Sequence, residues 1–106
     1  MAVLTKESPT TFSPRAGNLL TRVAETPDLE TALWKVLSDY ITLKIQAIQN
    51  EIDQFETKWE MSFAEFSEKF GDNDLPVDTY TYEVESDFWA WEQAETLLQH
   101  YESFQI

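Results

Sequence analysis

Apolar residues recur at helical spacing through the middle of the chain, between Leu29 and Trp59. No glycine or proline interrupts this segment. It follows Thr26-Pro27-Asp28, which has the residue types favoured where a helix begins, with Thr26 as the N-cap and Pro27 in the first turn. The pattern therefore predicts one long helix of roughly 45 Å.

The last six apolar positions of this segment are separated by four, three, four, three and four residues, the heptad spacing of a coiled-coil seam. These candidate seam residues are Ile41, Ile45, Ile48, Ile52, Phe55 and Trp59. A helix of this length cannot leave such a stripe in water. We therefore expect another helix, or a second copy of the chain, to cover it.

A second helix is predicted from Phe63 to Gly71. Ser62-Phe63-Ala64-Glu65 has the pattern of a capping box, and Met61 and Phe66 occupy the positions of a hydrophobic staple. Gly71 is the expected C-terminal stop. The following residues, 72–85, contain Pro76, and between positions 79 and 85 aromatic or apolar residues alternate with polar ones. These residues are therefore expected to form an extended segment that lies on the helices.

A third helix is predicted from Phe88 to about Ser103, with Ser86 or Asp87 as its cap. Trp89 and Trp91 cannot both point inward on this helix, because residues two apart lie about 200° around the axis. One tryptophan is therefore expected in the core and the other on the surface.

The predicted fold class is all-α: a long helix, a short helix and an antiparallel C-terminal helix, arranged as a helical hairpin or in a coiled-coil-like manner. Residues 1–26 are expected to form a flexible N-terminal arm, in which Leu19, Leu20 and Val23 indicate a short helix. Residues 27–106 are expected to form an acidic helical domain.

The charge of the chain points to a basic partner. Twenty acidic and seven basic residues give a net charge of −13, and between Gly71 and the C-terminus there are nine carboxylates and no lysine or arginine. Direct binding to nucleic acid is not expected, because affinity for a phosphate backbone comes from lysine and arginine. A dense acidic surface instead favours association with a basic protein.

The candidate partner-binding residues combine these carboxylates with one tryptophan, a residue type that is over-represented in binding hot spots. They are Asp72, Asp74, Asp78, Glu83, Glu85, Asp87, Trp89 and Glu92.

Catalytic and metal-binding patterns find little support in the sequence. His100 is the only histidine, there is no cysteine, and no glycine-rich phosphate loop is present. Asp72, Asp74 and Asp78 resemble a fragment of a calcium loop, with Glu83 at the twelfth position, but the central glycine is missing, so a solvated acidic loop is favoured. We expect no enzymatic activity, no cofactor and no metal.

The sequence also bears on location. Residues 1–20 lack the apolar core of a signal peptide, and no apolar run approaches the roughly 18 residues of a membrane helix. The absence of cysteine removes any disulfide framework. A cytoplasmic protein that does not enter membranes is expected.

Two segments resemble small acidic helical antitoxins of prokaryotic toxin–antitoxin pairs. Residues 48–66, IQNEIDQFETKWEMSFAEF, are similar to the family pattern EIxxFExKYGMSxEEF, and residues 87–92, DFWAWE, are similar to a following DxxEW segment. The resemblance spans about Leu37 to Leu98 and implies a helical protein that folds against a small toxin and blocks it. Glu60 stands where the pattern has glycine, so the turn before Met61 is expected to differ.

Three hypotheses of function follow. The first is a protein-binding inhibitor, an antitoxin that neutralises a small basic toxin through its acidic aromatic half. The second is a DNA-mimic inhibitor of a nucleic-acid enzyme. The clustering of the acids in a loop counts against this second hypothesis. The third is a coiled-coil assembly subunit that forms a homodimer through residues 41–59.

Overall fold

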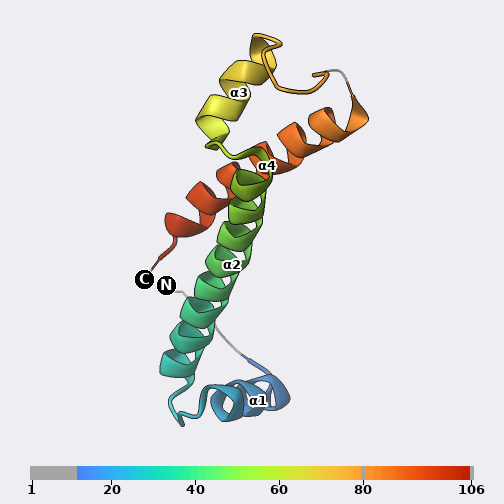
Figure 1. The fold of residues 1–106 in the computed structure, drawn as a ribbon. Coiled ribbons are helices and arrows are strands. Elements are labelled where there is room, and N and C mark those ends of the chain that lie inside the picture. Colours follow the sequence, from blue (N-terminus) through green and yellow to red (C-terminus); the bar gives the residue numbers. More distant parts are fainter. Residues whose placement is uncertain (1–11, 80, 106) are drawn as a thin grey trace, which may run out of the picture. The chain divides into compact units, whose positions relative to one another are not determined.

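The computed structural model describes residues 12–79 and 81–105. These residues form four helices, α1 (Pro14–Ala24), α2 (Leu29–Trp59), α3 (Phe63–Gly71) and α4 (Tyr82–Glu102) (Figure 1). No strand occurs among them, and the predicted all-α fold class is confirmed. Within the same residues, no helix combines the length and the apolar character needed to cross a membrane.

The chain divides into two compact units, an N-terminal unit of residues 1–40 and a C-terminal unit of residues 41–106. Helix α2 contributes its first part to the N-terminal unit and the remainder to the C-terminal unit. The division predicted from the sequence, an arm of residues 1–26 and a domain of residues 27–106, stays a prediction. Residues 1–11 of the proposed flexible arm lie outside the described residues.

The short helix expected around Leu19 is present, and it begins earlier than the apolar pattern indicated. The Ser13 hydroxyl accepts a hydrogen bond from the Ala16 backbone N–H at 3.1 Å, and Pro14 occupies the first helical position. Because these two local signals are sufficient to start a helix, residues 14–16 belong to α1 and not to an irregular arm.

Helix α1 ends in a left-handed turn at Glu25, which has φ 59°. The Lys35 ammonium, from α2, donates a hydrogen bond to the carbonyl of Ala24 at 2.7 Å. A carbonyl in the last turn of a helix has no partner within the helix, so this contact both satisfies it and ties α1 to α2 inside the N-terminal unit.

The long helix is confirmed, but its cap is not the predicted one. Asp28, and not Thr26, caps α2: its carboxylate accepts hydrogen bonds from the backbone N–H of Thr31, at 2.9 Å, and from the Thr31 hydroxyl. Aspartate is at least as good an N-cap as threonine, and its position two residues later places the first helical residue at Leu29.

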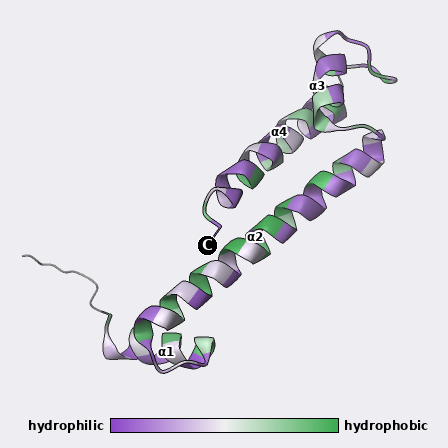
Figure 2. Ribbon diagram, turned by 90° about the vertical axis from the view of Figure 1, so that its left-hand side faces the viewer, coloured by the Kyte–Doolittle hydropathy of each residue, from purple (hydrophilic) through white to green (hydrophobic). Residues whose placement is uncertain are grey.

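The C-terminal unit is an antiparallel hairpin of α2 and α4. Along α2, Lys58, Phe55 and Lys44 contact Glu83, Trp91 and Tyr101 of α4 respectively, so residue numbers fall along one helix as they rise along the other. Figure 2 shows α4 running back beside this part of α2. The predicted antiparallel C-terminal helix is therefore confirmed.

The core of this hairpin is formed by buried residues from α2, α3 and α4. They are Ile48, Ile52, Phe66, Val84, Trp91 and Ala94. Aromatic side chains from all three helices pack against this cluster, which fixes the orientation of α4 about its own axis.

The predicted limits of α3 are confirmed, and its ends show how they arise. The Ser62 hydroxyl accepts a hydrogen bond from the Glu65 backbone N–H at 3.2 Å, as a capping box requires. At the other end, the left-handed residue is Asn73, with φ 56°, and Gly71 remains helical. The Asp74 N–H donates to the Lys69 carbonyl at 2.8 Å, which closes the helix two residues after Gly71.

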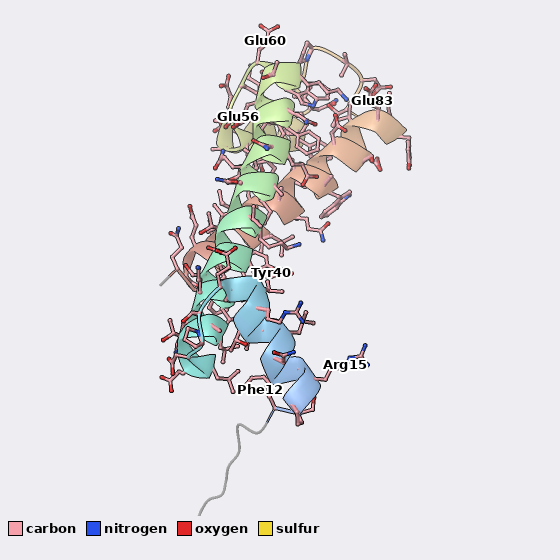
Figure 3. All side chains as sticks on the ribbon, turned by 90° about the horizontal axis from the view of Figure 1, so that it is seen from below. Phe12, Arg15, Tyr40, Glu56, Glu60 and Glu83 are labelled. Atoms are coloured by element: carbon pink, nitrogen blue, oxygen red, sulfur yellow. The ribbon has the colours of Figure 1, made fainter. Side chains whose placement is uncertain are left out.

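Between α2 and α3 the chain turns at Glu60, which is labelled in Figure 3. Glu60 has φ 57°, in the left-handed region, and its N–H donates to the Glu56 carbonyl at 2.7 Å. Left-handed backbone is costly for a residue with a Cβ atom and is the usual reason for glycine at such a position. The turn thus has the geometry of a glycine turn although glutamate occupies it.

The prediction for residues 82–85 is wrong, since this stretch is helical and not extended. Helix α4 begins at Tyr82, six residues before the predicted start, and the Thr81 hydroxyl accepts a hydrogen bond from the Val84 N–H at 3.3 Å. The residues proposed as caps, Ser86 and Asp87, lie inside the helix. Alternation with polar neighbours predicts Tyr82 and Val84 on one face of a strand, whereas the structure has Tyr82 exposed and Val84 buried, as expected for residues two apart on a helix. The threonine cap marks where this helix begins. Tyr80 lies outside the described residues.

Candidate functional site

Helix α4 has one face in the core and one in solvent. The buried face carries Val84, Trp91 and Ala94. The opposite side carries a stripe of exposed residues separated by three, four and three positions, which lie above one another on a helix. We call this stripe, Tyr82, Glu85, Trp89 and Glu92, the acidic aromatic stripe.

The two tryptophans of α4 divide as the sequence predicted. Trp91 is fully buried, whereas Trp89 is 62% exposed. The ring of Trp91 stacks on Phe55 of α2 at 5.4 Å between centroids and lies 5.0 Å from Phe66 of α3. Because Trp91 is locked among aromatic rings from two other helices, Trp89, two residues earlier, is held pointing away from the core.

The acidic loop between α3 and α4 contains the other candidate carboxylates. Asp72, Asp74 and Asp78 are all exposed, and Thr79 at the end of the loop is buried. The buried Thr79 attaches this end of the loop to the unit.

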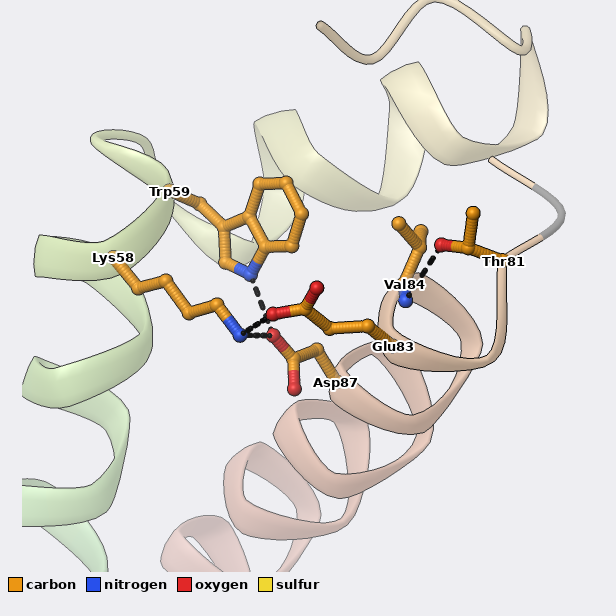
Figure 4. Close-up of polar contacts among 6 residues, drawn as sticks. All are labelled: Lys58, Trp59, Thr81, Glu83, Val84 and Asp87. Atoms are coloured by element: carbon orange, nitrogen blue, oxygen red, sulfur yellow. Dashed lines mark hydrogen bonds and ion pairs between the residues drawn. The ribbon is translucent and has the colours of Figure 1, made fainter. Parts of the chain in front are cut away.

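Two of the predicted partner-binding carboxylates take part in contacts within the hairpin (Figure 4). The Lys58 ammonium lies 2.6 Å from a carboxylate oxygen of Asp87 and 2.8 Å from one of Glu83. The Trp59 indole N–H donates to the same Asp87 oxygen at 3.0 Å. The side chain of Asp87 is only 15% exposed, whereas that of Glu83 is 70% exposed.

These contacts have an electrostatic consequence. The carboxylate of Asp87 and, to a smaller extent, that of Glu83 raise the pKa of Lys58 above its usual range. Lys58 remains an ammonium at neutral pH and offsets part of the negative charge at the start of α4. Asp87 therefore joins α2 to α4, and its role in binding a partner stays a prediction.

The predicted seam is partly covered by the chain itself. Ile48 and Ile52 are buried in the hairpin core, and Phe55 and Trp59 pack against it. Ile41 and Ile45 are half-buried. Helices α3 and α4 of the same chain thus cover the later part of the stripe, and a role of these six residues in joining two copies stays a prediction.

Charge is distributed very unevenly between the two units. Residues 41–106 carry fifteen acidic and three basic residues, a net charge of −12, whereas residues 1–40 carry five acidic and four basic residues, a net charge of −1. The acidic aromatic stripe and the acidic loop both belong to the strongly charged unit. Long-range attraction of a cationic partner would therefore act on this unit.

The remaining candidate chemical groups are the potential metal ligands and the single histidine of the sequence. No three His, Asp or Glu side chains are grouped to hold a metal ion in the described part of the chain. His100, in the last turn of α4, is exposed and lies edge-on to Tyr101 and Phe104 at 5.4 and 4.7 Å between ring centroids.

Comparisons with protein-family models, with curated proteins and with solved structures find no match to this chain.

Two members of this site were missed from the sequence. The sequence pattern predicts Tyr82 in an extended segment, and it does not identify Lys58 as the cation that pairs with the start of α4. The three- and four-residue spacing from Tyr82 to Glu92 would have revealed the stripe if Thr81 had been identified as the helix cap. No local pattern could have revealed Lys58, because its partners are 25 and 29 residues away.

Proposed function

We propose that this protein is a binding module whose C-terminal unit captures a basic protein and inhibits it. The more specific form of the proposal is an antitoxin that neutralises a small basic toxin. The observation that carries the proposal is the acidic aromatic stripe, where an exposed tryptophan lies between two exposed carboxylates on a well-packed helix.

Each component of the stripe suits such a partner. Trp89 offers a large apolar surface, and an arginine placed over its face would gain cation–π attraction. Glu85 and Glu92, on either side, can accept hydrogen bonds from guanidinium or ammonium groups. Because Trp91 anchors α4 in the core, the stripe needs little reordering on binding, which lowers the entropic cost of association.

The surrounding carboxylates have a different role in this proposal. Asp72, Asp74 and Asp78 would raise the rate of encounter through long-range attraction. Glu83 and Asp87 would contribute less, because both already pair with Lys58.

A DNA-mimic inhibitor is the second candidate. It is favoured by the early start of α4, which adds Glu83 and Glu85 to the helix that also carries Glu92. The two candidates differ over Trp89: a mimic of a phosphate backbone needs regularly spaced charge and no aromatic anchor, whereas capture of a basic protein uses the tryptophan as its centre. The third candidate, an assembly subunit, requires neither the stripe nor the loop.

The test uses the full chain as bait in a nuclease-treated lysate of the source cell, at low and moderate salt. Two variants disrupt the stripe, Trp89→Ala and the double change Glu85→Gln with Glu92→Gln. The matched control removes two exposed acids from α2, through Glu51→Gln and Glu56→Gln. We expect one small basic protein, released by salt, whose capture both stripe variants reduce at least about tenfold, as loss of a hot spot would, while the control binds nearly as well as the original chain.

The outcomes separate the candidates. Equal capture by the stripe variants and the control would contradict the proposed surface. Capture of several nucleic-acid enzymes, unaffected by Trp89→Ala, would favour the DNA mimic. The antitoxin form further requires that the captured protein arrests growth when expressed alone and that co-expression of this chain restores growth.

A further inference from the structure

The N-terminal unit has almost no core of its own. Among its described residues only Ala24 and Ala32 are buried, and both are small. Its large apolar side chains remain accessible, with Leu19 60% and Val23 65% exposed. The C-terminal unit, by contrast, fully buries Phe66 and Trp91. Apolar surface that stays in water is unfavourable by about 25 cal/mol per Å², so the exposed face of this unit favours association.

The exposed residues border one apolar groove within the N-terminal unit. The groove has a volume of about 360 Å³, and Phe12 and helices α1 and α2 contribute to it. Its lining contains no charged or polar side chain and consists of Phe12, Ala16, Leu19, Leu20, Val23, Leu33 and Val36. The patch therefore combines a hollow between two helices with a ridge, Leu19 and Val23, one helical turn apart on α1.

We infer that this groove binds the same groove of a second copy of the chain, so that two N-terminal units form a symmetric bundle of four helices. A two-fold interface requires a patch that is complementary to itself. The ridge formed by Leu19 and Val23 on one copy can enter the hollow of the other, and the reverse contact forms at the same time. Ridge-into-groove contacts of this kind are how helices pack in bundles.

Charge selects a second copy as the occupant and this unit as the place of contact. Two N-terminal units, each with a net charge of −1, approach each other with little repulsion. Two C-terminal units, each with −12, repel strongly. A groove without a charged lining residue also offers nothing to select a strongly charged partner. This inference does not depend on the proposed function, because the stripe and the groove lie in different units.

The first test is the mass of the full chain in solution, measured by sedimentation equilibrium over a wide range of concentration. The original chain is expected to be a dimer. The double variant Leu19→Glu with Val23→Glu places four carboxylates in the symmetric contact and is expected to be a monomer. Val77→Glu, which makes the same change at an exposed valine of the C-terminal unit, is the matched control and is expected to remain a dimer.

The result that would overturn the inference is a monomer at every concentration, or a dimer that Leu19→Glu with Val23→Glu leaves intact. A third observation would also overturn it: a monomeric full chain that dimerises only after residues 1–11 are removed, because the chain's own N-terminal segment would then occupy the groove. Circular dichroism of the double variant must show unchanged helix content, so that loss of the dimer is not loss of α1.

A second measurement does not depend on disrupting the contact. The chain has no cysteine, so Asn18→Cys, at an exposed position of α1 beside Leu19, can carry a single nitroxide label. Dipolar coupling between two labels is expected, and it should disappear when labelled protein is diluted with an excess of unlabelled protein. Absence of coupling in a sample of dimeric mass would refute contact through the N-terminal units.

Discussion

The contact between Lys58 and Asp87 provides the sharpest test of the hairpin, because it separates a carboxylate with an internal role from one available to a partner. The change Asp87→Asn keeps an oxygen that can accept from the Trp59 indole and removes the charge that faces Lys58. We expect this variant to lower the free energy of unfolding. Glu92→Gln, which neutralises an exposed carboxylate on the same helix, is the control.

The expected magnitude follows from exposure. Hydrogen bonds to charged groups contribute about 1.5–3 kcal/mol when buried, and exposed ion pairs about 0.2–1 kcal/mol. The Asp87 side chain is 15% exposed but that of Lys58 is 43% exposed, so solvent screens the ion pair and its contribution lies in the range of exposed pairs. The part-buried hydrogen bond from the Trp59 indole to the same carboxylate is weakened as well when the charge is removed. We expect Asp87→Asn to cost about 1–2 kcal/mol, or very roughly 4–15 °C in Tm, and Glu92→Gln to change stability by less than about 0.5 kcal/mol.

Urea unfolding followed by tryptophan fluorescence measures both variants, at low salt and at high salt. High salt should reduce the cost of Asp87→Asn, because it screens the partly exposed pair. A double-mutant cycle with Lys58→Met isolates the pair, with an expected coupling of about 0.5–1 kcal/mol. If Asp87→Asn were as stable as Glu92→Gln, or showed no coupling to Lys58, the internal role assigned to Asp87 would be refuted.

Three further predictions concern single positions. Glu60→Gly should raise the Tm by removing the left-handed strain, with a net gain of about 0.5–1 kcal/mol after the added flexibility of the unfolded chain, whereas Glu60→Ala should give no such gain. Trp91→Ala should cost about 3–5 kcal/mol in urea unfolding and Trp89→Ala less than about 0.5 kcal/mol, and equal costs would contradict the assigned faces of α4. Hydrogen bonds from Thr31 hold the pKa of the Asp28 carboxyl below its usual value. The ionised cap therefore stabilises α2 fully at a pH above about 3.9, the pKa of aspartate in the unfolded chain. This stabilisation is lost as the pH falls through the lower pKa of the folded chain. Hydrogen exchange of the Thr31 backbone amide measures this effect, after correction for the intrinsic pH dependence of exchange. Protection of the amide should decrease as the pH is lowered in the original chain and stay nearly constant in Asp28→Asn.

Local signals in the sequence were sufficient for much of the secondary structure. Ser62 and Glu65 define the start of α3, and the uninterrupted apolar period defines the length of α2, because capping and helical periodicity depend on residues within one or two turns. Thr81 gives the same kind of signal, but the alternation of Tyr82 and Val84 with polar residues predicts an extended segment where the structure has a helix. That error came from a local pattern compatible with two structures.

Sequence periodicity also showed that one of Trp89 and Trp91 must leave the core, since neighbours two apart face opposite sides of a helix. It could not say which one. That choice depends on Phe55 and Phe66, which come from other helices and pack around Trp91. The contact made by Asp87 is a second example. Asp87 is one of nine carboxylates between Gly71 and the C-terminus, and nothing in the sequence distinguishes it from the other eight. The structure does, because the Lys58 ammonium lies 2.6 Å from its carboxylate.

The amino-acid sequence by itself therefore determined the helical class, the ends of α3, the length of α2 and the concentration of negative charge in residues 41–106. Only the tertiary structure decided which carboxylates are held within the hairpin, that α3 and α4 cover the later part of the apolar stripe, and that Leu19 and Val23 of the N-terminal unit stay exposed. The physical reason is range: capping, periodicity and net charge arise from neighbours along the chain, whereas burial and pairing arise from residues that folding brings together from distant positions.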